Sequence, residues 1–86
     1  MKMFAFSVRD SKAKAFVVPF FMASKAQAIR GFMDACDDQK TMMCKHPEDF
    51  NLYCVGEFDD ESAQLIPYDA PEFLSSALDC KVELKK

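Results

Sequence analysis

Apolar and polar positions alternate with a period of two over residues 2–8, and this alternation predicts a β-strand. A second run with the same period covers residues 14–20, after a short polar turn, so the two runs predict a β-hairpin. Pro19 has no N–H to donate to a neighbouring strand, so the second strand should be an edge strand or end near Pro19. Both faces of this hairpin are apolar: Phe4, Phe6, Phe16 and Phe20 share one face, and Met3, Ala5, Ala15, Val17 and Phe21 share the other.

The period changes to that of a helix after Ser24. Ser24 and Gln27 have the spacing of a capping box, in which each side chain bonds a free backbone N–H of the first turn. Apolar residues then recur at helical spacing, namely Ile29, Phe32, Met33 and Cys36. We therefore expect a helix from about Lys25 to Asp38. Gly31 costs such a helix about 1 kcal/mol relative to alanine, and a close approach of the helix to the sheet would explain it.

The second half of the chain predicts another hairpin. Pro47 suits the first position of a short helical turn, in which Glu48 and Asp49 are favourably placed. Residues 51–58 then alternate as a third strand, residues 59–62 form an acidic turn, and residues 64–68 return as a fourth strand. In the third strand, one face would hold Leu52, Cys54, Gly56 and Phe58, and the other Tyr53, Val55 and Glu57.

Residues 69–86 form a tail for which two structures compete. Pro71 could start a helix, with one face formed by Phe73, Leu74, Ala77 and Leu78. Residues 81–84 could instead form a short fifth strand. The whole pattern predicts one α+β domain over residues 1–86, with its core at about residues 2–68. A four-stranded antiparallel sheet of two hairpins would carry one main helix on one face, in the order ββαββ, with a short C-terminal helix as one alternative for the tail.

The first hairpin is more apolar than a half-solvated sheet should be. An antiparallel sheet with one wet face normally alternates apolar and polar positions, whereas both faces are apolar here. Either the C-terminal helix or another protomer must cover the second face. We expect a homodimer, because two-fold dimers are the commonest oligomers, and because a chain of 86 residues is marginal as a monomer.

Charge and composition exclude several classes of function. The net charge of −3 counts against non-specific binding to duplex nucleic acid, which depends on lysine and arginine. The chain has no apolar run long enough to span a membrane and no signal-peptide pattern, so we expect a cytosolic protein without membrane contact. The spacing of the four cysteines contains no C-x-x-C pair, which favours buried, reduced thiols at Cys36, Cys44, Cys54 and Cys80.

The segment around His46 is the first candidate for chemistry. His46 with Glu48 or Asp49 has the composition of a general acid–base pair, but no nucleophile or phosphate-binding loop accompanies it. Cys44 and His46 form a lone C-x-H, unlike the paired ligands of structural zinc sites. The acidic turn lacks the twelve-residue calcium loop with its glycine. We therefore expect no catalysis, no metal and no cofactor, and interpret the segment as a capped turn before a strand.

A second candidate is a basic concentration in the first half of the chain, formed by Arg9, Lys12, Lys14 and Arg30, with Lys25 nearby. Together with Phe16, Phe20 or Phe21 these residues could form a platform on which the bases of single-stranded nucleic acid stack. Core phenylalanines beside a solvated turn are the favoured interpretation, since a domain this small needs its rings inside.

Several motifs occur in a fixed order along residues 3–66: Val8-Arg9-Asp10-Ser11-Lys12-Ala13, Pro19-Phe20-Phe21, Ala28-x-Arg30-x-Phe32, His46-Pro47-Glu48-Asp49-Phe50-x-Leu52-Tyr53 and Gly56-x-Phe58-Asp59-Asp60. In this combination the chain resembles the small non-structural protein of gokushoviruses, microviruses with circular single-stranded DNA genomes. The family often has a glycine after the acidic turn, where this chain has Ser62-Ala63.

The resemblance implies a phage-encoded, non-capsid protein in the host bacterial cytoplasm, with a role around single-stranded DNA synthesis or packaging. It brings no catalytic residues. Two functions remain open: a module that binds single-stranded viral DNA or replication and packaging proteins through Arg9, Lys12, Lys14 and Arg30, or a dimeric adaptor that contacts viral or host proteins without nucleic acid. We interpret the remaining motif positions as structural, namely His46, Pro47, Glu48, Asp49, Phe50, Gly56, Phe58 and Asp59.

Overall fold

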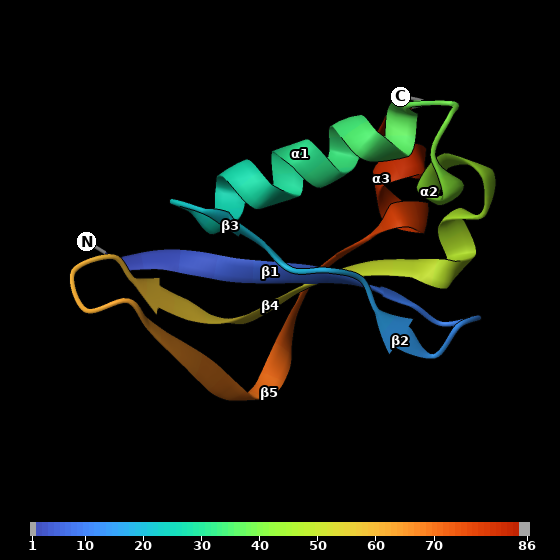
Figure 1. Ribbon diagram of the computed structural model, residues 1–86. Coiled ribbons are helices and arrows are strands. Elements are labelled where there is room, and N and C mark those ends of the chain that lie inside the picture. The colour runs from blue at the N-terminus through green and yellow to red at the C-terminus, as the bar shows by residue number, and fades with distance from the viewer. Residues whose placement is uncertain (1, 85–86) are drawn as a thin grey trace.

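The structure is a computed structural model that describes the backbone of residues 2–84 and the side chains of residues 2–80. Its centre is one curled antiparallel sheet (Figure 1). The strands lie in the order β2-β1-β4-β5, and β3 also pairs with β1. Their bounds are β1 (Lys2–Asp10), β2 (Ala15–Phe16), β3 (Phe20–Met22), β4 (Phe50–Asp59) and β5 (Gln64–Ser76).

The helical segments gather on one side of the sheet, where α1 and α3 pack against each other (Figure 1). They are α1 (Lys25–Asp37), α2 (Met42–Lys45), the 3₁₀ turn η1 (Pro47–Asp49) and α3 (Ala77–Leu84). The α+β class and the antiparallel sheet are as predicted. The simple order of two hairpins around one helix is not, because the second strand is broken in two and because α2, η1 and α3 add further helical turns.

Helix α1 agrees with the prediction to within one residue. The Ser24 hydroxyl accepts a hydrogen bond from the Gln27 backbone N–H at 3.2 Å and so caps the helix. Its buried face packs on the sheet through Ala28, Phe32 and Cys36. A Cβ at Gly31 would lie 3.6 Å from the Met22 methyl carbon, an ordinary contact. The close approach expected at this glycine is therefore absent.

The edge strand breaks at residues 17–19, as Pro19 predicted. The Ser7 hydroxyl donates to the Val17 carbonyl at 2.7 Å and holds the break against β1. Phe16 pairs with Arg9, whereas Phe20 pairs with Phe6. Arg9 and Phe6 are three positions apart and face opposite sides of the sheet. The prediction that Phe16 and Phe20 share a face is therefore wrong.

A bulge in β4 reverses the predicted faces of the third strand. Ala5 pairs with Gly56 and Phe6 with Cys54, so Val55 is an extra residue in the ladder. Leu52 and Cys54 face the helices and are buried. Beyond the bulge, Phe58 pairs with Met3 and shares the face of Tyr53. The expectation that Gly56 and Phe58 continue the face of Leu52 and Cys54 is therefore wrong.

Strand β5 is much longer than the predicted residues 64–68, and it leaves β4 at a corner. Pro67 pairs with Gly56 and Glu72 with Cys54, so four residues of β5 lie opposite Val55 alone. Two contacts attach the corner. The Tyr68 hydroxyl donates to Glu57 Oε2 at 3.1 Å, and Glu72 Oε1 lies 2.8 Å from Lys25 Nζ on α1. Burial raises the pKa of Tyr68, and so do its neighbours Cys54 and Glu57, so the hydroxyl keeps its proton.

The tail ends in a short C-terminal helix, which was one of the two predicted alternatives, but this helix begins later than expected. Pro71, Phe73 and Leu74 lie in β5, so the helix expected from Pro71 is a strand. Helix α3 begins only at Ala77, after the Ser76 hydroxyl accepts from the Asp79 N–H at 3.0 Å. Residues 81–84 belong to this helix and form no fifth strand. Ala77 and Cys80 are buried in the core, beyond the boundary at residue 68 that the sequence indicated.

The acidic turn between β4 and β5 ends in a strained residue. Asp59 Oδ1 accepts from the Glu61 N–H at 3.0 Å, and this bond lowers the pKa of Asp59. Ala63 has φ 63°, in the left-handed region that glycine adopts without cost. An alanine in that conformation costs about 1–2 kcal/mol. The turn therefore carries backbone strain at Ala63, and a glycine there would relieve it.

The cysteines and methionines pack as small and flexible apolar side chains. Cys36, Cys54 and Cys80 are buried in the core and Cys44 is half-buried, as expected of thiols that act as small apolar side chains. Met43 packs against the core, whereas Met42 is exposed on α2. Within residues 2–84, no helix has the length and apolarity that a membrane crossing requires.

Candidate functional site

The sheet face opposite to the helices is covered by no other element of residues 2–84 (Figure 1). The sequence predicted that either the C-terminal helix or another protomer covers this face. Helix α3 packs on α1 and does not cover it. We call it the open face. Strand pairing places the following side chains and glycine on it: Met3, Ala5, Ser7, Arg9, Phe16, Phe21, Tyr53, Gly56, Phe58, Leu65 and Phe73.

Three aromatic rings cross one end of the open face, and we call them the aromatic row: Phe16, Tyr53 and Phe73. The ring centroids of Phe16 and Tyr53 are 5.6 Å apart, and those of Tyr53 and Phe73 are 5.8 Å apart, both edge to face. Phe16 is 43% exposed and Phe73 55%. Arg9 lies on β1 directly opposite Phe16. This end therefore combines accessible rings with a guanidinium.

The turn between β1 and β2 carries two more cations beside the aromatic row, Lys12 and Lys14, both exposed. Asp10 Oδ1 shapes this turn by accepting the backbone N–H of Lys12 at 3.0 Å. Ser11 donates its N–H, at 2.9 Å, and its hydroxyl, at 3.1 Å, to the Asp49 carbonyl. The basic turn is thereby attached to η1, so the segment around His46 helps to position it.

Two acidic groups of the sheet lie on the helix side. Glu57 Oε1 is 3.6 Å from Lys2 Nζ, and Glu72 pairs with Lys25. The positions of the central strands β1 and β4 that lie on the open face hold no carboxylate. Arg9 is the one charged residue among them. The centre of the open face is therefore not acidic, although the whole chain has a net charge of −3.

Arg30 is separated from the other basic candidates. It lies on α1, on the far side of the sheet, where it lines a shallow hollow with Gln27 and Asp34. Phe20, the second expected ring of a stacking platform, faces the core and stacks on Phe6 at 5.6 Å. The structure thus places Arg9 opposite Phe16, with Lys12 and Lys14 on the adjoining turn. It leaves Arg30 and Phe20 elsewhere.

The other end of the open face is apolar, and we call it the apolar end. The rings of Phe21 and Phe58 are 5.8 Å apart, and with Met3 and Leu65 they line a hollow of about 320 Å³. A second hollow of about 370 Å³ adjoins it, since both share Phe21 and Leu65. Its remaining lining is Ala5, Pro19, Val55, Gly56, Glu57, Ile66 and Pro67.

Sequence reasoning missed Tyr53 and Phe73 as surface residues. Tyr53 was placed on a face without a role, and Phe73 on a helix that does not form. The signal that would have found Phe73 is its place in an apolar run interrupted by two prolines, which favours an edge strand over a helix.

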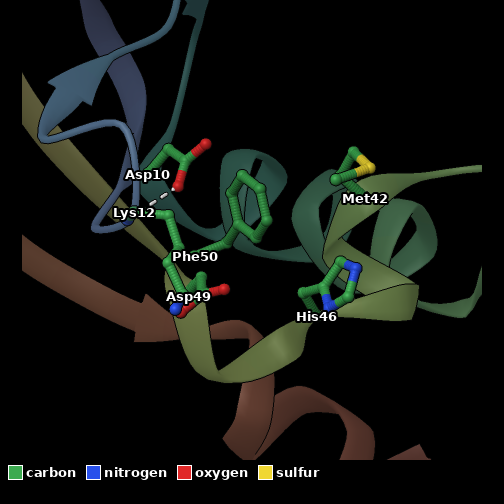
Figure 2. Close-up of a pocket in the computed structure, with 6 residues that line it drawn as sticks. All are labelled: Asp10, Lys12, Met42, His46, Asp49 and Phe50. Carbon is green, nitrogen blue, oxygen red and sulfur yellow. Dashed lines mark hydrogen bonds between the residues drawn. The ribbon is translucent and has the colours of Figure 1, made fainter.

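The segment around His46 borders a hollow of about 230 Å³, between the basic turn and α2 (Figure 2). Asp10 and Lys12 line it from the turn, and Met42 and His46 from the helical side; Asp49 and Phe50 complete the lining. Phe50 is buried in the core, and Pro47 starts η1 as predicted. The segment therefore joins the helical layer to β4.

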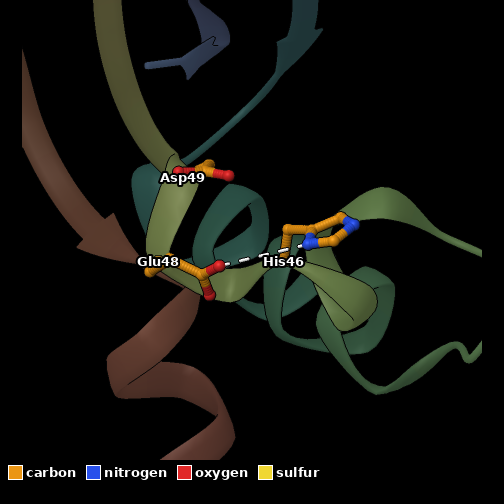
Figure 3. A group of neighbouring side chains, drawn as sticks. All are labelled: His46, Glu48 and Asp49. Carbon is orange, nitrogen blue, oxygen red and sulfur yellow. Dashed lines mark ion pairs between the residues drawn. The ribbon is translucent and has the colours of Figure 1, made fainter. Parts of the chain in front are cut away.

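His46, Glu48 and Asp49 place their ligand atoms within 4.8 Å of one another (Figure 3). His46 Nδ1 is 4.0 Å from Glu48 Oε1, and both side chains are more than half exposed. That distance exceeds hydrogen-bond reach, about 2.6–3.2 Å for an acid–base pair. An exposed group of this kind carries no mark of a metal centre beyond its composition.

We predict that His46→Ala leaves the protein intact. An exposed side chain without a hydrogen bond in reach should change the free energy of unfolding by no more than about 0.5 kcal/mol. Thermal unfolding followed by circular dichroism measures this, with Met42→Ala, which alters the same hollow, as the matched control. A fall in Tm of several degrees for His46→Ala alone would contradict a passive role.

The chain is similar to proteins of bacteriophages. A family model described as phage ORF5 protein matches residues 3–80. Protein ORF5 of Chlamydia phage 1 is 35% identical over 74 residues, which cover 81% of this chain and 77% of that protein. No solved structure matches this one significantly.

Proposed function

The chain belongs to the phage ORF5 protein family, and on this premise we propose that it is a non-catalytic viral module that binds single-stranded DNA on its open face. The observation that carries the proposal is the aromatic row beside Arg9, on a face whose central strands present no carboxylate. The binding would serve synthesis or packaging of viral DNA in the cytoplasm of the host bacterium.

Unpaired bases suit such a surface, because every base has a π-face that stacks on an aromatic ring. Phe16 and Phe73 are exposed enough to be reached. Arg9, Lys12 and Lys14 lie where a backbone leaving the row would pass, so they would hold phosphates. Contacts of this kind position the strand without selecting a sequence.

We expect the protein to bind a fluorescent oligothymidine at low salt, with affinity that falls as salt rises. Three phosphate contacts give a slope of about −2 in log K against log salt. The triple variant Arg9→Gln, Lys12→Gln, Lys14→Gln should lose this slope and most of the affinity. Fluorescence anisotropy measures both quantities.

Arg30→Gln is the matched control, since it removes one cation from the opposite side of the sheet. It should bind like the wild type. If the wild-type protein shows no anisotropy change at low salt, or if Arg30→Gln weakens binding as much as the triple variant, the proposed surface is wrong.

A second candidate function is favoured by the apolar end. Its hollows offer contacts to apolar side chains, as an adaptor between viral or host proteins would require. An adaptor of this kind would give no response to DNA in the titration above, whereas the first proposal requires one.

A further inference from the structure

The apolar end combines a ridge and a depression on one patch. Phe21 and Leu65 belong to the lining of both hollows, so they separate the two and form the ridge. The adjoining hollow of about 370 Å³ has Ala5 and Gly56 in its lining, which are the smallest side chains of the two central strands at that point. Large and small groups therefore lie next to each other across β1, β3 and β4.

We propose that the apolar end is a dimer interface, occupied by the same surface of a second copy of this chain. A two-fold axis presents one patch to itself, so each contact occurs twice. The ridge lies beside the hollow. A two-fold axis that passes between the two would therefore place the ridge of each copy in the hollow of the other. Two sheets would then pack face to face, about 10 Å apart.

The exposed area fits this occupant. Phe21 is 42% exposed and Leu65 65%, and Pro19 and Pro67 are exposed beside them. At 150–250 Å² for a large side chain, the apolar end offers on the order of 400 Å² of apolar surface. A standard interface needs about 800 Å² per partner, of which a little over half is apolar.

Charge also favours a second copy over a polar ligand. The hollow of about 320 Å³ has no charged lining residue. The hollow of about 370 Å³ has one, Glu57, which pairs with Lys2. Two chains of net charge −3 can therefore meet here without burying an unpaired charge, which would cost several kcal/mol. A chain of only 86 residues would also gain a second core.

The dimer goes beyond the proposed DNA binding and leaves it in place. The aromatic row lies at the opposite end of the open face and stays accessible. Each dimer would carry two rows, so an oligonucleotide long enough to reach both would bind more tightly than a short one through effective concentration.

The test is the mass of the protein in solution, measured by sedimentation equilibrium over a range of concentrations. We expect a dimer for the wild-type chain and for Leu78→Glu, which places the same charge on an exposed apolar residue of α3. Leu65→Glu should be monomeric, because each dimer would bury two unpaired carboxylates. Phe21→Ser should weaken the dimer by removing the ridge.

A wild-type chain that stays monomeric at every concentration would overturn the proposal, as would a dimer that survives Leu65→Glu unchanged. Circular dichroism tests whether Leu65→Glu is folded. We expect it to be folded, because the Leu65 side chain is exposed. A short oligothymidine separates the two proposals, since the Leu65→Glu monomer should still bind it through the aromatic row.

Discussion

Replacing both Phe16 and Phe73 by serine should weaken binding of single-stranded DNA by about 30-fold or more. Each stacked base contributes about 1–3 kcal/mol, and the double variant removes two of the three rings in the aromatic row. Every 1.4 kcal/mol is a factor of ten in affinity. The loss should persist at high salt, because stacking releases no counterions, whereas the slope of affinity against salt should stay near its wild-type value.

This difference in salt dependence separates the rings from the cations. The arginine and lysine variants should change the slope, and the phenylalanine variants should change the affinity at constant slope. Leu78→Ser is the matched control, since it removes an exposed apolar side chain from α3 on the other side of the sheet. An equal loss of binding for Leu78→Ser, or none for the double variant, would show that the bases do not stack on the row.

Gly56→Ala should destabilise the protein by about 3 kcal/mol, the upper end for an overpacked site. An added Cβ would lie 2.5 Å from the Ile66 carbonyl oxygen and 3.2 Å from Pro67 Cα. Both are backbone atoms, so β4 and β5 would have to separate at the bulge. For a domain of this size we expect Tm to fall by about 12–24 °C.

Gly31→Ala is the matched control and should shift Tm in the opposite direction. Its Cβ would meet only the flexible Met22 methyl at 3.6 Å, and alanine favours a helix by about 1 kcal/mol over glycine. We expect Tm to rise by about 4–8 °C. If both variants lower Tm, α1 packs more closely on the sheet than the 3.6 Å contact at Gly31 implies. If Gly56→Ala leaves Tm unchanged, the bulge has room for a methyl group.

The two glycines illustrate which predictions local pattern can support. The close approach that would explain Gly31 does not exist. Gly56 is structural, as the motif indicates, but the pattern does not show that its neighbours leave no room for a side chain. Both questions concern distances to residues far along the chain. Neither the helical nor the strand period contains that information.

The resemblance to gokushovirus proteins is confirmed by the family match and by the phage relative. The motif residues that carry the resemblance serve different purposes in the structure. Pro47 and Phe50 join η1 to β4, Gly56 makes room at the bulge, and Asp59 shapes the acidic turn. DNA binding and the dimer remain proposals, to be decided by the titrations and the solution mass described above.

Local sequence was sufficient for the α+β class, for helix α1 with its Ser24 cap, for the break at Pro19 and for the turn started by Pro47. Each of these depends on residues within a few positions of one another, whose backbone preferences act in any context. The basic turn with Lys12 and Lys14 belongs to the same group.

Tertiary pairing decided which side chains face solvent. One extra residue at Val55 moves Phe58 to the open face, the break before Phe20 turns that ring inward, and the corner of β5 brings Phe73 beside Tyr53. Because side chains alternate with a period of two, a shift of one residue exchanges the faces of a strand. The energy that selects such a shift lies in contacts between strands, so the open face exists only in the folded sheet.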